Sequence, residues 1–463
     1  MADKQHHHFL FITSSHQGHI SPTLHLARHL ATSTGAAVTF STTVFAHRRM
    51  FSSNQDLISD GLITFIPYSD GYDDGFKSEP SIFTDKFHSY VRTNSKRSVS
   101  EIVGNHAGRG QPVTCIIYTI VLNWAVEVAR EHGILSVLYW IQTSSVFATY
   151  YHFFHGFESL IKTHIDDLSF TVSFPGLQPL QIRDLPSFVR VTNYDSADGS
   201  ILCLFREMFE ILDEEKERMK AMVLMNTFQE WETDALASFN VEIEAIPVGL
   251  LPKETNSGAG YLFKEDEKKY MEWLDTKEDG SVVYISFGTM VEMKKEQIKE
   301  MVKGLKESKR PYLWVVRKDN REEELLEIEG GGDGMVVEWC SQVRVLAHKA
   351  VGCIVTHCGW NSTLESLACG VPMVCVPQWS DQGINAKLVE SLWGCGVRSE
   401  VDGDGVVKGE ELVRCLELVM GDGEKGVEIR RKAKMWKDEA LVAGSEGGSS
   451  YLNFRAFVRK ISD

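Results

Sequence analysis

The sequence lacks long hydrophobic runs. No stretch of about 18 or more apolar residues occurs in the 463-residue chain, so it offers no transmembrane helix. The apolar segment near the N-terminus, within MADKQHHHFLFITSS, is too short for a signal peptide. We therefore expect a cytosolic protein that does not insert into a membrane.

Long basic runs are absent too. Lys and Arg number 48 against 64 Asp and Glu, which gives a formal net charge of −16. Such an acidic chain argues against nucleic acid and against an anionic membrane surface as partners. A negatively charged small ligand would have to be held by local hydrogen-bond donors, because the overall field of the protein does not attract it.

Motifs for metals, disulfides and dinucleotides are also missing. The nine cysteines include no CxxC pair, although six of them lie between Cys340 and Cys395, and we expect small buried thiols rather than zinc ligands or disulfides. The run His6 to His8 is short for a metal site, and Asp402 to Asp404 is more simply a glycine-containing turn. No GxGxxG follows the first predicted strand, which argues against a dinucleotide-dependent oxidoreductase.

The chain instead alternates strand-like apolar runs with helical patterns, which is typical of parallel α/β sheets. At 463 residues it is too long for one ordinary domain. Between its halves, the segment Pro247 to Gly260 has the Pro, Gly, Asn and Ser content of a linker. The predicted strands are Phe9 to Thr13, Val38 to Thr42, Ile63 to Pro67, Thr114 to Tyr118, Ser136 to Trp140 and Val223 to Asn226, then Val282 to Phe287, Tyr312 to Val316, Met335 to Val337, Cys353 to Thr356 and Met373 to Val376.

The stretch from Trp339 to Gln382 is the most informative part of the chain. It contains an apolar run, Val351 to Thr356, that predicts a buried parallel strand, and a helical pattern follows at Thr363 to Cys369. Asn361 or Ser362 can cap that helix at its N-terminus. A helix N-terminus at the carboxyl end of a strand is an anion site, because its backbone N–H groups and dipole favour negative charge.

The same stretch carries side chains that suit a nucleotide diphosphate. His357, Asn361 and Ser362 add donors for the diphosphate to the backbone N–H groups of the helix start. Glu365 lies one turn further along the helix, and a carboxylate there suits the two hydroxyls of a ribose.

The two ends of the stretch suit the base and the sugar. Trp339 offers a flat platform for a base and Gln342 a polar neighbour, whereas Asp381 and Gln382 can bond sugar hydroxyls. The alternative is a buried βαβ unit whose polar residues only cap and turn. For any single residue the two readings are evenly balanced, but the ensemble favours a sugar-nucleotide site.

This stretch resembles the C-terminal signature box of plant secondary-product UDP-glycosyltransferases. The similarity covers the whole chain, from SSHQGHISP near the start to GSEGGSSYLNFRAFV near the end. It implies an α/β protein of the GT-B fold, with two Rossmann-like domains that face each other across a cleft. Residues 1–246 would bind the acceptor, 247–260 would be the linker, 261–445 would bind the UDP-sugar, and a helix in 446–463 would pack back on the first domain.

The resemblance also implies the role of each donor residue. Trp339 would stack on uracil, while Gln342 and Glu365 would hold the ribose. A Gln at the position of Gln382 usually accompanies glucose. The full implied donor set is Gly18, Thr289, Trp339, Cys340, Gln342, His357, Trp360, Asn361, Ser362, Glu365, Asp381 and Gln382.

The first predicted βα turn carries a candidate base. The turn SSHQGHISP follows Phe9 to Thr13, so His16 and His19 lie at the carboxyl end of a strand, and Pro22 suits the first turn of the next helix. A neutral histidine can take the proton of an attacking hydroxyl. A histidine at a helix start is more often a cap or surface group, but the family pattern GHxxP implies that His19 is the base.

One position departs from the family pattern. Related enzymes usually carry an aspartate after the fourth strand, in a YD-x-x-x-x-W context, where it stabilises the protonated histidine. Here Tyr118 is followed by Thr119, and Trp124 completes the pattern. A threonine can accept a hydrogen bond from imidazole but cannot neutralise an imidazolium. We therefore expect a weaker base and a bias towards phenols, with a pKa near ~10, or carboxylates, ionised above ~5.

The resemblance implies inverting transfer from UDP-glucose to a β-glucoside, with UDP as the leaving group and with neither a metal nor another cofactor. We expect a monomer that acts on a small, flat, apolar acceptor such as a flavonoid or phenolic acid. Aromatic residues that form either its pocket or plain helix core are Trp140, Phe147, Tyr150, Tyr151, Phe153, Phe154, Phe157, Phe188 and Phe205. The alternative is a homologue that binds UDP-sugar or aglycone without turnover, which the replaced aspartate would support.

Overall fold

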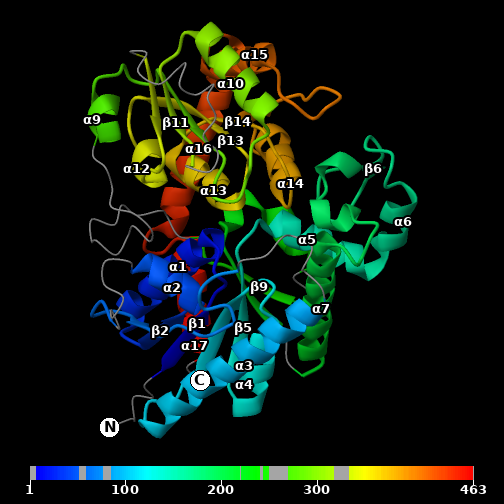
Figure 1. The fold of residues 1–463 in the computed structure, drawn as a ribbon, viewed down its shortest axis with the longest axis vertical. Helices are drawn as coiled ribbons and strands as arrows, with labels where there is room; N and C mark the ends of the chain where they lie inside the picture. Colours follow the sequence, from blue (N-terminus) through cyan, green and yellow to red (C-terminus); the bar gives the residue numbers. More distant parts are fainter. Residues whose placement is uncertain are drawn as a thin grey trace. The chain divides into compact units, whose positions relative to one another are not determined.

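The computed structural model describes residues 7–51, 59–76, 85–218, 221–239, 243–249, 269–317 and 333–461. The chain divides into two compact units (Figure 1). The N-terminal unit comprises residues 1–182, 187–250 and 443–463, and the C-terminal unit comprises 183–186 and 251–442. Most of the predicted linker, residues 250–260, lies outside the described residues.

The N-terminal unit is built on a seven-stranded parallel sheet in the order β3-β2-β1-β4-β5-β8-β9. Its central strands are buried along nearly their whole length, which explains why they are continuous apolar runs in the sequence. The order reverses at β1, between β2 and β4. The strands are β1 (His8–Ile12), β2 (Ala37–Ser41), β3 (Thr64–Phe65), β4 (Cys115–Thr119), β5 (Leu135–Trp140), β8 (Ala221–Met225) and β9 (Ile243–Pro247).

The sequence missed β9 and a small hairpin. Strand β9 forms the edge of the sheet and contains the charged residue Glu244, so it lacks the apolar run that marked the other strands. The hairpin pairs β6 (Thr171–Val172) with β7 (Leu180–Gln181), which are too short to leave a pattern. The helices are α1 (Gln17–Thr34), α2 (Val44–Met50), α3 (Asp85–Gly108), α4 (Trp124–His132), α5 (Ser144–His152), α6 (Glu158–Thr163), α7 (Ala197–Arg218), α8 (Thr233–Phe239) and α17 (Ser449–Lys460).

Helix α17 belongs to the N-terminal unit, although it ends the chain. Asn453 Nδ2 donates a hydrogen bond of 3.1 Å to the carbonyl of Pro247 in β9. The ring of Phe454 meets His29 of α1 edge-on at 4.5 Å, and Lys460 pairs with Glu244. These contacts join the last helix of the chain to the sheet edge and to the first helix.

The C-terminal unit contains a six-stranded parallel sheet in the order β12-β11-β10-β13-β14-β15, which reverses at β10. The short edge strand β15 was not predicted. The strands are β10 (Val282–Ser286), β11 (Tyr312–Val315), β12 (Gly334–Val337), β13 (Val351–Thr356), β14 (Met373–Cys375) and β15 (Gly396–Arg398). The helices are α9 (Lys269–Asp275), α10 (Lys295–Ser308), α12 (Gln342–Leu346), α13 (Trp360–Cys369), α14 (Gln382–Lys387), α15 (Gly409–Met420) and α16 (Glu424–Gly444).

The core of the C-terminal unit lies between its sheet and the helices α10 and α15. Helix α10 buries Ile298, Met301, Val302 and Leu305, whose spacing of three or four residues places them on one face. The short segment 183–186 also belongs to this unit. Its buried Asp184 pairs with Arg398 of β15 at 2.5 Å.

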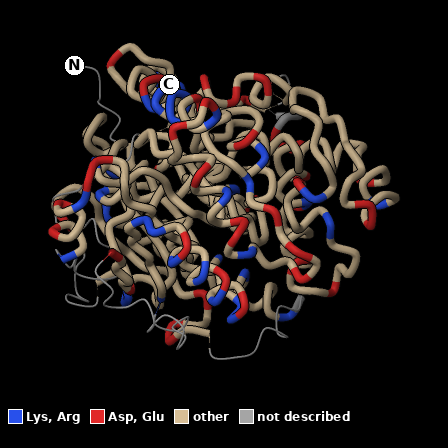
Figure 2. Tube along the Cα trace, turned by 90° about the horizontal axis from the view of Figure 1, so that it is seen from above, with Lys and Arg blue, Asp and Glu red and all other residues tan. Residues whose placement is uncertain are grey.

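The expected α/β class with two parallel sheets is confirmed. All nine cysteines are thiols rather than disulfides, and seven are buried. Among the described residues, no helix is both long and apolar enough to span a membrane, and no cluster of His, Cys, Asp and Glu is arranged to hold a metal ion. Figure 2 shows basic residues next to acidic ones in many places. In the C-terminal unit, for example, Arg414 pairs with Glu411 and Arg431 with Glu428.

Candidate functional site

The candidate base lies at the switch point of the first sheet, where ligands bind in open α/β sheets. Helix α1 begins at Gln17 with His16 as its N-cap residue, and His19 is in its first turn. Pro22 therefore falls in the second turn rather than the first, which corrects the sequence prediction. Having no N–H, it cannot bond to the carbonyl four residues earlier, and the helix continues through it.

His19, in the helix that follows β1, meets Thr119 at the end of the adjacent strand β4. The distance from His19 Nδ1 to Thr119 Oγ1 is 3.1 Å, and Thr119 is completely buried at the end of β4. Burial lowers the pKa of His19 to about 3, with a smaller contribution from His16. The imidazole is therefore neutral at physiological pH. If the threonine accepts from Nδ1–H, the lone pair of Nε2 is free to act as a base.

The loop after Thr119 contains a strained residue that the sequence did not reveal. Val121 has a φ of +61°, in the left-handed region that β-branched residues rarely adopt. Asn123 anchors this loop, because its Nδ2 donates to the carbonyl of Leu204 at 2.8 Å and to Glu207 Oε2 at 2.9 Å. Such strain persists where the surrounding structure imposes it, and it often marks functional sites.

The aromatic residues divide into core and partly exposed sets. Trp140, Phe147, Tyr150, Phe153, Phe188 and Phe205 are buried. Tyr150, for example, stacks on Phe205 at 4.4 Å. Tyr151, Phe154 and Phe157 are half-buried. Most of the group is therefore helix core, and the half-buried three remain as acceptor-wall candidates.

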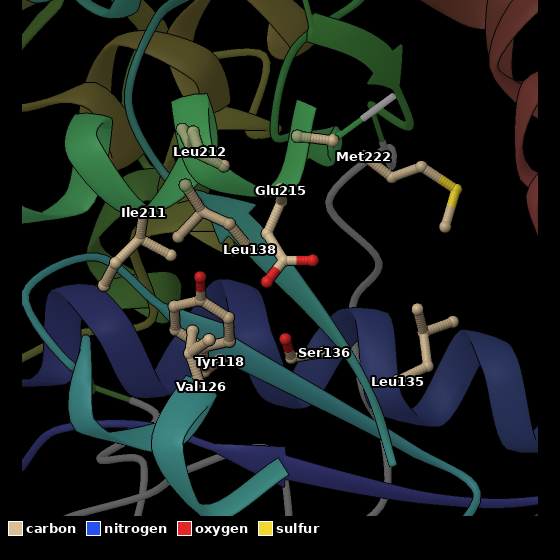
Figure 3. A pocket seen from close by; sticks show the side chains of 10 residues that line it. Tyr118, Val126, Leu135, Ser136, Leu138, Ile211, Leu212, Glu215 and Met222 are labelled. Atoms are coloured by element: carbon tan, nitrogen blue, oxygen red, sulfur yellow. The ribbon is translucent and has the colours of Figure 1, made fainter. Parts of the chain in front are cut away.

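A separate small cavity lies between β4, β5 and α7 (Figure 3). The hydroxyls of Tyr118 and Ser136 and the carboxylate of Glu215 point toward one another there, surrounded by apolar side chains such as Leu138 and Leu212. Its volume of about 30 Å³ suffices for roughly one water molecule. It is too small to hold an acceptor.

In the C-terminal unit, the switch point between β10 and β13 carries the predicted diphosphate residues. Helix α13 starts at Trp360 with Gly359 as the N-cap residue, and its first internal bond runs from Thr363 N–H to the Gly359 carbonyl at 3.1 Å. Asn361 and Ser362 thus lie in the first turn rather than at the cap, which corrects the prediction. The helix begins earlier because Cys358, at φ +64°, turns the chain directly out of the strand.

The His357 side chain packs against the backbone of two glycines, Gly288 and Gly359. A Cβ added to Gly288 or to Gly359 would come within 2.7 or 2.5 Å of His357 Nε2. Burial lowers the pKa of His357 to about 4, partly offset by a backbone hydrogen bond with Ser286. His357 can therefore act on a diphosphate as a neutral hydrogen-bond donor but not as a cation. Thr289, in the same turn as Gly288, is exposed.

The predicted ribose residues are in direct contact. Gln342 Nε2 donates to Glu365 Oε2 at 2.7 Å and to Ser362 Oγ at 3.0 Å. Burial raises the pKa of Glu365 to about 7, although the amide of Gln342 opposes this shift. Cys340 is buried two residues before Gln342, and Trp339 is half-buried in the segment that follows β12.

The predicted sugar residues are organised by the loop before α14. Asp381 is buried and accepts a 2.8 Å hydrogen bond from Asn385 Nδ2, and burial raises its pKa to about 6. Gln382 Oε1 accepts the backbone N–H groups of Gln378 at 2.8 Å and Trp379 at 3.1 Å. A hydrogen bond from Gln382 to a sugar hydroxyl would therefore come from its Nε2.

Trp360, also a member of the predicted donor set, is buried. Its indole is 3% exposed and packs on Trp393 at 6.0 Å. Its backbone N–H, at the start of α13, bonds to the Asp381 carboxylate. A contact between Trp360 and a sugar stays a prediction.

The comparisons with known proteins show which family the chain belongs to. A family model described as UDP-glucoronosyl and UDP-glucosyl transferase matches residues 162–441. The chain belongs to the UDP-glycosyltransferase family. It is 44% identical to a crocetin glucosyltransferase of Gardenia jasminoides over 98% of this chain and 97% of that one, and 43% identical to a phloretin 4'-O-glucosyltransferase of Malus domestica over 98% of each.

A solved member of the family supports the fold. The crystal structure of Os79 from O. sativa in complex with UDP has a TM-score of 0.83 and 29% sequence identity, over 98% of this chain and 100% of that chain. The expected GT-B fold and the expected glycosyltransferase activity are thereby confirmed. The roles of the individual donor residues, of His19 and of Thr119 stay predictions.

Proposed function

We propose that this glycosyltransferase uses UDP-glucose to glucosylate a phenolic hydroxyl or a carboxyl group of a small aromatic or apolar acceptor. The observation that carries the proposal is the contact set of Gln342, Ser362 and Glu365 beside the N-terminus of α13. It combines a carboxylate for ribose with N–H donors for a diphosphate. The names of the relatives, which include glucosyltransferases for crocetin and phloretin, support glucose and acceptors of this kind.

In the proposed reaction the acceptor oxygen attacks the anomeric carbon of glucose, and the bond from that carbon to the diphosphate breaks. Configuration inverts, the proton of a hydroxyl acceptor passes to His19 Nε2, and UDP leaves. The backbone N–H groups at the start of α13 and the neutral His357 stabilise the charge that develops on the diphosphate. We propose that these donors take the place of a metal ion.

The environment of His19 favours acidic acceptors. A base with a pKa of about 3 takes a proton poorly from an alcohol, whose own pKa is far higher. A phenol needs less help, and a carboxylic acid is already ionised at neutral pH. We therefore propose glucosides of phenols and glucose esters of aromatic or apolar acids as products.

An acceptor screen tests the proposal. Phenols, flavonoids, aromatic acids and aliphatic alcohols are offered with UDP-glucose, and mass spectrometry identifies the products. UDP-glucuronate, UDP-galactose and UDP-xylose serve as competing donors, and addition of EDTA tests whether transfer requires a metal ion. Faster turnover with another donor would refute UDP-glucose, and loss of activity in EDTA would refute metal-free transfer.

A second candidate function rests on Thr119, which stands where the family usually has an aspartate. In this alternative, the protein binds UDP-sugar or aglycone with little turnover. Failure to release UDP with any phenol or acid in the screen, despite binding UDP-glucose, would favour it.

We further propose that the protein is a monomer in the cytosol. Light scattering tests the oligomeric state. A fluorescent fusion tests the location, which needs a test because one relative is named as chloroplastic.

A further inference from the structure

We propose that Tyr284 is a positioning residue for the donor site, which fixes the amide of Gln342 and through it the carboxylate of Glu365. The inference rests on the proposed function in that it treats this carboxylate as the ribose acceptor. Tyr284 lies in the middle of β10, and its side chain is 1% exposed. Its hydroxyl is 3.2 Å from Gln342 Oε1 and 3.4 Å from Cys340 Sγ.

The contacts of Gln342 determine which way its amide points. Its Oε1 accepts from the Tyr284 hydroxyl, so its Nε2 is turned to Glu365 and Ser362. The two ends of a carboxamide have nearly the same shape, so packing alone does not distinguish them. Only the hydrogen-bond partners do, and the phenol of Tyr284 supplies a donor for the oxygen end.

A flipped amide would damage the ribose site. Gln342 Oε1 would then face the Glu365 carboxylate, so that two acceptors would meet where a donor and an acceptor meet now. Burial raises the pKa of Glu365, and the hydrogen bond from the Gln342 amide opposes this rise because it favours the ionised carboxylate. Loss of that bond would turn the carboxylate from its place and raise its pKa further.

Tyr284 is suited to act as a permanent donor. Burial raises its pKa well above the ordinary value, with Cys340 as the second cause, so its hydroxyl keeps its proton at any physiological pH. The polarity is consistent along the chain of contacts: the phenol donates to Gln342, and Gln342 donates to Glu365. Buried networks in which every donor meets an acceptor hold a single arrangement.

The variant Tyr284→Phe removes the hydroxyl and keeps the ring. Dissociation constants for UDP-glucose are measured by calorimetry on the full chain, together with kcat and the donor KM. We expect Kd and donor KM to rise about tenfold, equivalent to ~1.4 kcal/mol, with kcat at saturating donor within about twofold. Tyr68→Phe is the matched control, because it removes a buried phenol hydroxyl that bonds to the Thr13 carbonyl in the other unit.

A double-mutant cycle separates positioning from general stability. If Tyr284 acts through the amide, Tyr284→Phe has no further effect on Kd in a Gln342→Ala background. The pH dependence gives a second readout, because the diphosphate of UDP-glucose does not titrate near neutrality. The titration of donor affinity, expected near pH 7 from Glu365, should move to higher pH in Tyr284→Phe but not in Tyr68→Phe.

The outcomes are distinguishable. An unchanged Kd in Tyr284→Phe, or equal effects of the substitution with and without Gln342, would overturn the positioning role and leave the proposed function intact. If the wild-type chain binds no UDP-sugar, the proposed function fails, and the inference falls with it. The expected result is a Kd effect that needs Gln342 and a pH shift that Tyr68→Phe does not reproduce.

Discussion

The contact between His19 and Thr119 leads to a prediction that tests the proposed base directly. Replacing Thr119 by aspartate would put a carboxylate where a hydroxyl now lies 3.1 Å from His19 Nδ1. The carboxylate can only accept, so it would select the tautomer with the proton on Nδ1 and leave Nε2 as the base. A threonine hydroxyl can donate or accept and makes no such selection.

The size of the effect follows from the distance. A carboxylate about 4 Å from an imidazolium, at an effective dielectric constant of ~20, stabilises it by about 4 kcal/mol, or ~3 pKa units as an upper bound. The pKa of His19 would rise from about 3 towards ~6. Because position 119 is fully buried, desolvation of the new carboxylate would cost several kcal/mol and reduce this gain. We expect kcat/KM for a phenol to rise about tenfold.

The assay compares one phenol with one aromatic acid at saturating UDP-glucose. Thr119→Asp should raise kcat/KM for the phenol and leave the acid nearly unchanged, because the ionised acid has no proton to give up. Thr119→Asn is the matched control, since it has the shape of aspartate without the charge. The reasoning would be refuted by equal gains for both acceptors, by the same gain in Thr119→Asn, or by a gain that persists when His19 is alanine. Thermal unfolding of each variant checks the fold.

Three further predictions concern single residues of the two sites. His19→Ala should lower phenol turnover by ~10²–10⁴-fold and acid turnover far less. The pH profile of phenol turnover by the wild type should stay level until the pH falls towards about 4, because burial lowers the pKa of His19 to about 3. A fall in turnover near pH 6.5 that disappears in His19→Ala would contradict this expectation. Glu365→Ala should raise the donor KM by ~5- to 150-fold while the acceptor KM stays constant, because burying the two ribose hydroxyls without their acceptor costs ~1–3 kcal/mol. Unchanged donor kinetics would show that Glu365 does not bind the ribose. Gly288→Ala should weaken UDP-glucose binding several-fold, because φ is +70° there and the new Cβ would lie 2.7 Å from His357 Nε2. Gly280→Ala is the control for backbone strain, since Gly280 also has a positive φ but has open space around it. Equal losses of affinity in the two variants would exclude a specific clash with His357.

Much of the fold could be predicted because its central strands leave local patterns. The runs at β1, β4, β10 and β13 are continuously apolar since both faces of each parallel sheet are covered. The edge strands β9 and β15 carry charged residues, and β15 has only three residues, so no local pattern marked them. The segment 183–186 could not be assigned from sequence either, because its place depends on the pair Asp184–Arg398, whose members are 214 positions apart.

The sequence by itself determined the class of protein and supplied the candidate residues of the donor site, because residue types at short spacing specify a strand, a helix start and the groups beside them. Tertiary structure alone decided how those groups behave. Burial by distant segments lowers the pKa of His19 to about 3 and raises that of Glu365 to about 7. The amide of Gln342 is oriented by Tyr284, 58 positions earlier in the chain. Desolvation and hydrogen-bond direction depend on what surrounds a side chain in space, which a local pattern does not contain.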